Sequence, residues 1–338
     1  MVLIIGASSF IGVHTADEFL KQGSEVCVTG RNNKFRGYYE SKGVKYFNLD
    51  LTEKEDLRKL PEDIDGIILL SGLLPANSEA DLVSEENAAD YFYVNTIGTI
   101  NVLEFARKRG IKRVISTCSY ADVANSWCKD KAITEQEPRG YKYSGDHAVY
   151  VFSKNAASDV MEYYNQQYGM KNAWFRLPPV YGVGPHGSLR INGVVKKSGL
   201  QIFMEKAVKG EDITIFGDKD LSRDVVYVKD VAHAFYLAIN SPDTYGLYNM
   251  TSGRGVTLEE QAKTIAKVFA SNPDKQSEIK YDPSVNNNTP SFLFSIKKAH
   301  DDFGYTPEYA DFEIMMRDYK KDIEDGKYID LFKYDKIV

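Results

Sequence analysis

Val2-Leu3-Ile4-Ile5-Gly6-Ala7-Ser8-Ser9-Phe10-Ile11-Gly12 joins a short apolar run to a turn that contains two glycines. The apolar residues predict a buried strand, and the residues after Ile5 predict a turn that opens a helix. Such a junction directs backbone N–H groups and the positive helix end toward one point, where a pyrophosphate can bind. Ser9 stands where a middle glycine would allow the closest approach, so an ordinary strand-to-helix turn is the alternative. The position at the first βα junction favours dinucleotide binding through Gly6, Ser8, Ser9, Phe10, Ile11 and Gly12.

Short apolar runs alternate with helix-sized segments from this junction to about residue 180. Strands are predicted at Val2–Ile5, Val26–Thr29, Gly66–Leu70 and Val114–Thr117, and helices are predicted near 95–106 and 150–168. This alternation indicates an α/β fold with a doubly wound parallel Rossmann sheet, because strands buried on both faces read as continuous apolar runs.

The pattern loosens after Gly182, where Ile213–Phe216, Val225–Val228 and Leu247–Met250 read as isolated strands between helices. A smaller, irregular C-terminal α/β lobe that binds the substrate is therefore expected. We assign residues 1–178 plus about 224–245 to the dinucleotide-binding domain, and about 179–223 plus 246–338 to the substrate lobe.

Composition excludes several classes of protein. The 338 residues are 43% hydrophobic and 27% charged with a net charge of -6, which fits a globular protein with no general affinity for nucleic acid. The most apolar run, Gly66 to Leu74, is far shorter than the roughly 20 residues that span a bilayer. No basic stretch precedes the first apolar residues, so a cytoplasmic protein without membrane contact is expected. The 3 cysteines lack C-x-x-C spacing and no H-x-x-x-H pair occurs, so no metal site is predicted.

The second predicted strand ends in Gly30-Arg31, where an NAD-binding site usually presents an acidic side chain to the ribose. Glycine would leave space and arginine would supply positive charge for a 2′-phosphate, so NADP(H) is favoured and NAD(H) stays open. The alternative is that Arg31 is a solvated loop residue. Asp50 and Leu51, after the third strand, are candidates to bracket the adenine, and Lys34 or Arg36 to assist Arg31.

Tyr150-x-x-Ser153-Lys154 places a phenol and an ammonium one helical turn apart. A nearby lysine charge is expected to lower the tyrosine pKa from about 10 toward neutrality, which suits a general acid/base for alcohol and ketone interconversion. Tyr38-x-x-x-Lys42 matches the same pattern, as expected by chance among 23 tyrosines. Only Tyr150 follows a strand that ends in hydroxyl residues, at Ser116 to Ser119.

Several motifs occur in the order typical of one family: Gly6–Gly12, Asn95 with Gly98-Thr99, Ser119, Tyr150 with Lys154, Arg176–Gly182, and Arg223–Ala232. Over about residues 1–310 the chain resembles the extended short-chain dehydrogenases/reductases of the NAD(P)-dependent epimerase/dehydratase family. The resemblance implies that Ser119 and Tyr150 hydrogen-bond the reacting oxygen, and that Lys154 binds the nicotinamide ribose and tunes Tyr150. It also implies a homodimer built from helices near 95–109 and 150–168. The further residues that the resemblance implies at the cofactor are Ser71, Gly72, Asn95, Pro179 and Val180.

Departures from the family narrow the chemistry. Sugar-nucleotide dehydratases of this family place Asp-Glu directly after the catalytic hydroxyl residue, whereas this chain has Tyr120-Ala121. Because Ala121 has no proton to exchange, dehydration by that mechanism is not expected. Arg223 matches the arginine that binds the substrate diphosphate in members of the family, with a salt bridge to Asp224 or another acidic residue as the alternative. Ser119, Tyr120 and Arg223 are therefore the predicted substrate-binding residues.

The predicted function is NAD(P)-dependent oxidoreduction of a nucleotide-sugar, as a 4-epimerase or a ketoreductase. One alternative is an NADPH-dependent reductase of a carbonyl substrate without a nucleotide. Another is a non-catalytic NADP-sensing protein, which the presence of Ser119, Tyr150 and Lys154 argues against.

Overall fold

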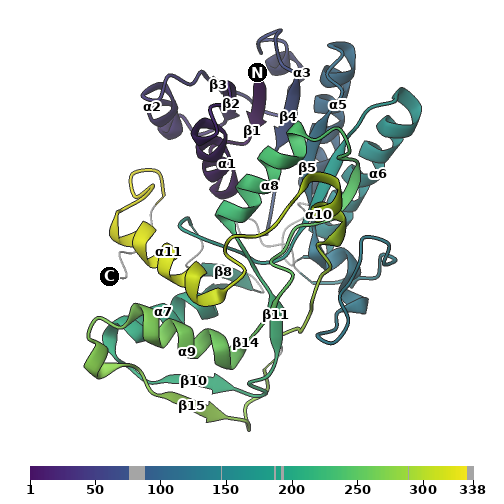
Figure 1. Ribbon diagram of the computed structural model, residues 1–338. Helices are drawn as coiled ribbons and strands as arrows, with labels where there is room; N and C mark the ends of the chain where they lie inside the picture. The colour runs from purple at the N-terminus through teal and green to yellow at the C-terminus, as the bar shows by residue number, and fades with distance from the viewer. Residues whose placement is uncertain (76–87, 146, 186–187, 192–193, 288, 333–338) are drawn as a thin grey trace.

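A seven-stranded parallel sheet organises the larger part of the molecule, in the order β13-β6-β5-β4-β1-β2-β3 (Figure 1). The computed structural model describes residues 1–75, 88–145, 147–185, 188–191, 194–287 and 289–332. The sheet strands are β1 (Val2–Ile5), β2 (Val26–Gly30), β3 (Tyr46–Asn48), β4 (Gly66–Leu69), β5 (Val114–Ser119), β6 (Ala173–Leu177) and β13 (Gly246–Asn249). Every neighbouring pair is parallel, so the doubly wound α/β prediction is confirmed.

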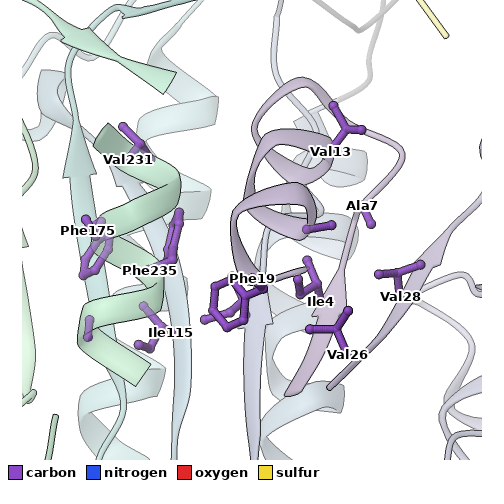
Figure 2. Packing of buried hydrophobic residues seen from close by; sticks show 14 of the residues in the cluster. Ile4, Ala7, Val13, Phe19, Val26, Val28, Ile115, Phe175, Val231 and Phe235 are labelled. Atoms are coloured by element: carbon purple, nitrogen blue, oxygen red, sulfur yellow. The ribbon is translucent and has the colours of Figure 1, made fainter. Parts of the chain in front are cut away.

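Both faces of the sheet are buried, and the side chains of successive β1 residues pack on opposite faces. Ile4 packs with Phe19 of α1 (Phe10–Lys21) and Phe235 of α8 (Val228–Asn240) in one core (Figure 2). Leu3 and Ile5 pack in a second core against α5 (Gly98–Lys108) and α6 (Ala148–Tyr168). This alternation explains why the strands read as continuous apolar runs.

Shorter helices complete this part: α2 (Lys34–Glu40), α3 (Lys54–Leu57), α4 (Ala88–Tyr91), α10 (Lys297–Phe303), a π-helix η1 (Phe92–Ile97) and a 3-10 helix η2 (Tyr120–Ser126). The π-helix η1 runs directly into α5, within the region predicted as one helix. Among the described residues, no helix combines the length and apolar character needed to cross a membrane.

A second group of elements has its own hydrophobic core, around Met204, Ile215, Ile265 and Met316. It contains α7 (Gly199–Lys209), α9 (Leu258–Phe269), η3 (Pro273–Lys275) and α11 (Phe312–Glu324). Its strands form four short pairs: β10 (Ile213–Phe216) with β15 (Ile279–Asp282), β11 (Ser222–Asp224) with β14 (Gly255–Thr257), β12 (Val226–Tyr227) with β7 (Val180–Tyr181), and β8 (Ser188–Ile191) with β9 (Val194–Lys197). The predicted irregular lobe is present, while the domain boundaries stay a prediction.

Two expectations about strands need correction. The run Leu247–Met250 is not isolated, because β13 pairs with β6 at one edge of the large sheet. The run Val225–Val228 is divided: Val226 and Tyr227 form β12, whereas Val228 begins α8. The strand pairing joins distant parts of the chain, which a local pattern does not reveal.

The segment after α11 returns to the large sheet domain. Tyr328, Leu331 and Phe332 are buried in the same core as α1 and α2. The Tyr328 hydroxyl donates to Asp17 at 2.7 Å, and the Phe332 ring lies 5.5 Å from that of Phe35. Tyr328 adopts a left-handed conformation, with φ of 59°, that is uncommon for tyrosine. This segment is therefore part of the folded domain.

Candidate active site

The turn between β1 and α1 is closely packed against the end of β4. Gly6 has φ of 89°, and a Cβ there would lie 2.5 Å from the Ser71 backbone nitrogen. A Cβ on Gly12 would lie 2.2 Å from the Gly6 carbonyl oxygen. Both positions therefore require glycine. Such a turn at a helix N-terminus fits a pyrophosphate, so these residues suit a dinucleotide.

Ser9 is explained by its role as the N-cap of α1. Its φ of -108° is ordinary extended backbone, so serine fits without strain. The hydroxyl donates to the Gly6 carbonyl at 2.7 Å and accepts from the Gly12 N–H at 3.1 Å. The missing glycine is thus replaced by a residue that stabilises the helix start. The Phe10 side chain turns toward the loop after β7, where a Cβ on Gly184 would lie 2.4 Å from its ring.

The end of β2 differs from what the sequence suggested. Gly30 leaves no open space, because a Cβ there would lie 2.3 Å from the Ser8 Oγ and 2.5 Å from the Tyr46 hydroxyl. The Arg31 side chain is 70% exposed, and its Nη1 lies 3.7 Å from Asp50 Oδ2. Burial opposes ionisation of Asp50, but hydrogen bonds from Thr52 and the Arg31 charge outweigh it and lower its pKa.

The two proposed helpers of Arg31 are engaged elsewhere. Lys34 donates to the Leu331 carbonyl at 3.3 Å, and Arg36 donates to the Tyr46 carbonyl at 3.1 Å. The sequence could not reveal the first contact, because Leu331 is almost the length of the chain away. Leu51 is buried, and its carbonyl accepts from Asn101 at 2.8 Å; its role at the adenine stays a prediction.

Ser119, Tyr150 and Lys154 are carried by β5 and α6, which pack together. Ser119 is buried at the end of β5, where its Oγ accepts from the Ala121 N–H at 3.2 Å. Lys154 is also buried, with its Nζ 3.4 Å from Thr117 Oγ1 on the same strand. Both Tyr150 and Lys154 interact electrostatically with Cys118, which lies between Thr117 and Ser119. The structure therefore brings the predicted catalytic residues to one end of one strand.

The predicted lowering of the Tyr150 pKa is wrong, because the structure raises this pKa instead. Burial raises the pKa of Tyr150 above its ordinary value, and the neighbouring Cys118, Tyr120 and Tyr91 add to the effect. Burial also lowers the pKa of Lys154 to about 8. Desolvation disfavours the charged form of each group, so at neutral pH the phenol keeps its proton.

Asn95 connects three parts of the site. Its Oδ1 accepts from the Leu73 N–H at 2.8 Å, and its Nδ2 donates to the Leu73 carbonyl at 3.0 Å and to Ser153 Oγ at 2.9 Å. Asn95 lies in the π-helix η1, and π turns are frequent at functional sites. Ser71 and Gly72 precede Leu73, and a Cβ on Gly72 would lie 3.2 Å from Asn95 Oδ1. A direct cofactor contact by these residues stays a prediction.

Arg223 is available for a ligand. Its side chain forms no ion pair or hydrogen bond with the described residues, and its buried Nε lacks a partner. The alternative salt bridge to Asp224 is wrong, because Asp224 instead accepts from Ser252 N at 3.0 Å and from Phe294 N at 3.1 Å. The Arg223 charge favours ionisation of Tyr120 and of Tyr181, so these side chains lie near one another.

Sequence reasoning missed a buried ion pair beneath this site. Arg176 donates to Asp122 through Nε at 2.8 Å and Nη2 at 3.0 Å, and to Asn249 Oδ1 through Nη1 at 2.9 Å. Asp122 belongs to η2, which begins directly after Ser119, so the pair fixes that turn to β6 and β13. An arginine inside an apolar strand was the available signal. Pro179 and Val180 follow β6, and Pro179 accepts from the Val226 N–H at 3.2 Å; their place beside a nicotinamide stays a prediction.

No group of three or more histidine, cysteine, aspartate or glutamate side chains in the described ranges is arranged to hold a metal ion.

Comparison with known proteins identifies a family and several relatives. The sequence model of the NAD dependent epimerase/dehydratase family matches residues 2–250, which confirms the resemblance. The chain is 26% identical over 320 residues to a putative UDP-glucose 4-epimerase of Methanocaldococcus jannaschii, covering 91% of this chain and 93% of the relative. It is 25% identical over 334 residues to the UDP-glucose 4-epimerase of Halalkalibacterium halodurans, covering 93% of each.

Solved structures agree with the fold. The Thermus thermophilus UDP-glucose 4-epimerase in complex with NAD is 27% identical, with a TM-score of 0.69, and the match covers 94% of this chain and 96% of that one. The Thermotoga maritima UDP-glucose 4-epimerase with UDP-glucose has a TM-score of 0.75 at 22% identity, covering 96% and 98% of the two chains. The alignment therefore includes both lobes.

Proposed function

Because the chain belongs to the NAD dependent epimerase/dehydratase family, we propose that it is a nucleotide-sugar 4-epimerase that acts on a UDP-linked hexose. Relatives named as UDP-glucose 4-epimerases, matched over more than 90% of both chains, support this substrate class. The observation that carries the proposal is Arg223, whose guanidinium pairs with none of the described residues and lies close to Tyr120, the residue that follows Ser119. A guanidinium fork pairs well with the phosphate oxygens of a diphosphate.

The protein residues have defined tasks in this reaction. A bound nicotinamide dinucleotide would accept a hydride from the sugar and return it to the other face. Ser119 donates a hydrogen bond to the reacting oxygen, and Tyr150 exchanges the proton of that oxygen. Tyr150 must ionise to accept a proton, and the Lys154 ammonium, one helical turn away, is the charge placed to favour this. The Gly6–Gly12 turn would hold the pyrophosphate.

Tyr150→Phe tests the proposal, with Tyr163→Phe on the same helix as a matched control. UDP-glucose is supplied and UDP-galactose is measured. Tyr150→Phe is expected to abolish interconversion while the affinity for the dinucleotide stays within about twofold, since only a hydroxyl is lost. Tyr163→Phe is expected to retain wild-type turnover. Full activity of Tyr150→Phe, or no interconversion by the wild type, would contradict the proposed function.

A second candidate is an NADPH-dependent reductase, favoured by the absence of an acidic side chain at Gly30 and by the exposed Arg31. The nucleotide released from the denatured protein, identified by mass, separates the candidates. Stoichiometric NAD supports the epimerase, which regenerates its cofactor in each turnover. A protein without nucleotide that then binds NADPH in preference to NADH supports the reductase. If Arg31→Ala weakens NADPH and NADH equally, Arg31 does not read the 2′-phosphate.

We also propose that two copies associate through η1, α5 and α6. Tyr93 is 59% exposed and Tyr163 52% exposed, and Ile97 is also exposed. Tyr93 and Ile97 lie on η1, which packs against α5 and α6, and Tyr163 lies on α6; α5 and α6 run side by side in Figure 1. Exposed large apolar side chains on neighbouring helices are typical of an association surface. Light scattering of the wild type should give twice the chain mass, and Tyr93→Glu with Ile97→Glu should give the mass of a monomer. The cytoplasmic location expected from the sequence stays a prediction.

A further inference from the structure

Tyr120 holds an unusual position relative to the predicted reaction centre. It follows Ser119 directly and begins the 3-10 helix η2. Its ring stacks on Trp127, with centroids 5.1 Å apart and planes 14° apart, and it lies 5.1 Å from the ring of Phe292. Trp127 and Phe292 are themselves 5.3 Å apart. The three rings support one another, so Tyr120 is held in one place.

Tyr120 is also close to both ends of the proposed substrate site. It contributes to the environment that raises the pKa of Tyr150, so the two phenols are near each other. Arg223 favours the ionised form of Tyr120, and Arg223 is joined to Phe292 by a backbone β-bridge. Tyr120 therefore neighbours both the acid/base residue and the unpaired guanidinium.

The chemistry of a nucleotide-sugar gives this position a meaning. The reacting carbon belongs at Tyr150 and the diphosphate at Arg223, and the glycosyl ring is what connects them. A side chain that neighbours both groups is placed to border the glycosyl ring. We infer that Tyr120, backed by Trp127 and Phe292, forms the wall of the glycosyl subsite and selects the sugar. This inference rests on the proposed function.

The wall predicts a neutral hexose without a bulky substituent. Aromatic faces pack well against the C–H groups of a sugar ring, and none of the three residues carries a charge to pair with a uronate. Trp127 and Phe292 prevent Tyr120 from turning aside to admit a larger group, since displacing it would disrupt two ring contacts. Selectivity by exclusion follows from such a rigid wall.

The experiment measures binding by calorimetry with three probes: UDP, UDP-glucose and UDP-N-acetylglucosamine. In the wild type, UDP-glucose should bind more tightly than UDP-N-acetylglucosamine. Tyr120→Ala should leave the Kd of UDP within about twofold and weaken UDP-glucose about fivefold, because an aromatic contact is lost. The same variant should reverse the preference between the two sugars. Tyr120→Phe keeps the ring and should retain the wild-type preference. Arg223→Ala should weaken all three probes.

The outcomes separate the inference from the proposed function. Equal weakening of UDP and UDP-glucose in Tyr120→Ala, or an unchanged preference between the sugars, would overturn the inference alone. A wild type that binds none of the three probes would overturn the proposed function and the inference with it. If Tyr120→Ala fails to fold, Tyr120→Leu, which retains more side-chain volume, is measured in the same way. Correct folding is checked by unchanged dinucleotide affinity.

Discussion

The buried pair of Arg176 and Asp122 gives a quantitative prediction. Both side chains are at most 4% exposed, and the guanidinium forms two hydrogen bonds to the carboxylate and a third to Asn249. Arg176→Met removes the cation while keeping much of the volume, so Asp122 is left buried without its counter-charge. Breaking a buried pair in this way costs about 3–5 kcal/mol of the free energy of unfolding.

The assay is urea unfolding followed by tryptophan fluorescence, at pH 5 and at pH 8. Burial already raises the pKa of Asp122 despite Arg176, and without Arg176 the pKa should rise further. A carboxyl with a raised native pKa stabilises the fold below its unfolded pKa, and this stability is lost as the pH rises through the native value. The loss in Arg176→Met should therefore be larger at pH 8 than at pH 5.

A double variant isolates the interaction. Asp122→Leu with Arg176→Met replaces the pair by apolar side chains and should recover at least half of the lost stability, since such replacements are often tolerated. If Arg176→Met lowers the free energy of unfolding by less than about 1 kcal/mol, which is well below the cost of breaking a buried ion pair, the reasoning is refuted. A loss that is the same at both pH values would refute it as well, because it would mean that a cavity and not a charge is responsible.

Three further predictions concern the turn, the site and pH. Gly12→Ala should weaken dinucleotide binding, measured by calorimetry, at least tenfold, because the added Cβ would lie 2.2 Å from the Gly6 carbonyl oxygen. Gly37→Ala is the control: a Cβ there would meet nothing within 4 Å, so binding should be unchanged. Equal effects of the two variants would refute the packing argument. Asn95→Ala removes the hydrogen bonds to Leu73 and Ser153 and should lower kcat, measured as UDP-galactose formation, at least tenfold. Asn101→Ala removes only the hydrogen bond to Leu51 and should retain most of the turnover. Equal turnover by the two variants would contradict the role of Asn95. Burial raises the pKa of Asp224 to about 6, so its contribution to stability is present below about pH 4 and lost as the pH rises through about 6. Asp224→Asn should remove that slope, on the order of 1 kcal/mol per pH unit, from urea unfolding curves, and a slope that persists would assign it to other groups.

Local patterns in the sequence predicted the sheet, which the structure confirms, and the candidate catalytic residues, whose role stays a prediction. Val2–Ile5 and the Gly6–Gly12 turn encode a strand, a turn and a helix within a few residues, so their meaning can be read directly. Tyr150 and Lys154 are one helical turn apart, and their match to the family order supplied Ser119 as their partner. Each of these features depends on residues close together in the chain or on a known order of motifs.

Features that depend on distant contacts could not be predicted. Asp122 meets Arg176 across 54 residues, and Lys34 reaches Leu331 across 297. The sequence predicts space for a 2′-phosphate at Gly30, because nothing nearby in the chain shows that Ser8 and Tyr46 pack against it. The Tyr150 pKa was judged from one charged neighbour, whereas burial by the whole fold decides its direction.

The contact between the C-terminal segment and α1 has a consequence for how the protein is made. Asp17 and Phe35 leave the ribosome some 300 residues before Tyr328 and Phe332, which cover them. Until then a nascent chain would display an uncovered apolar surface beside its first helix. Domains that wait for a distant segment in this way are prone to aggregate during synthesis. A chain shortened before Tyr328 would keep that surface exposed permanently, so a C-terminal affinity tag is a safer choice for purification than a truncation.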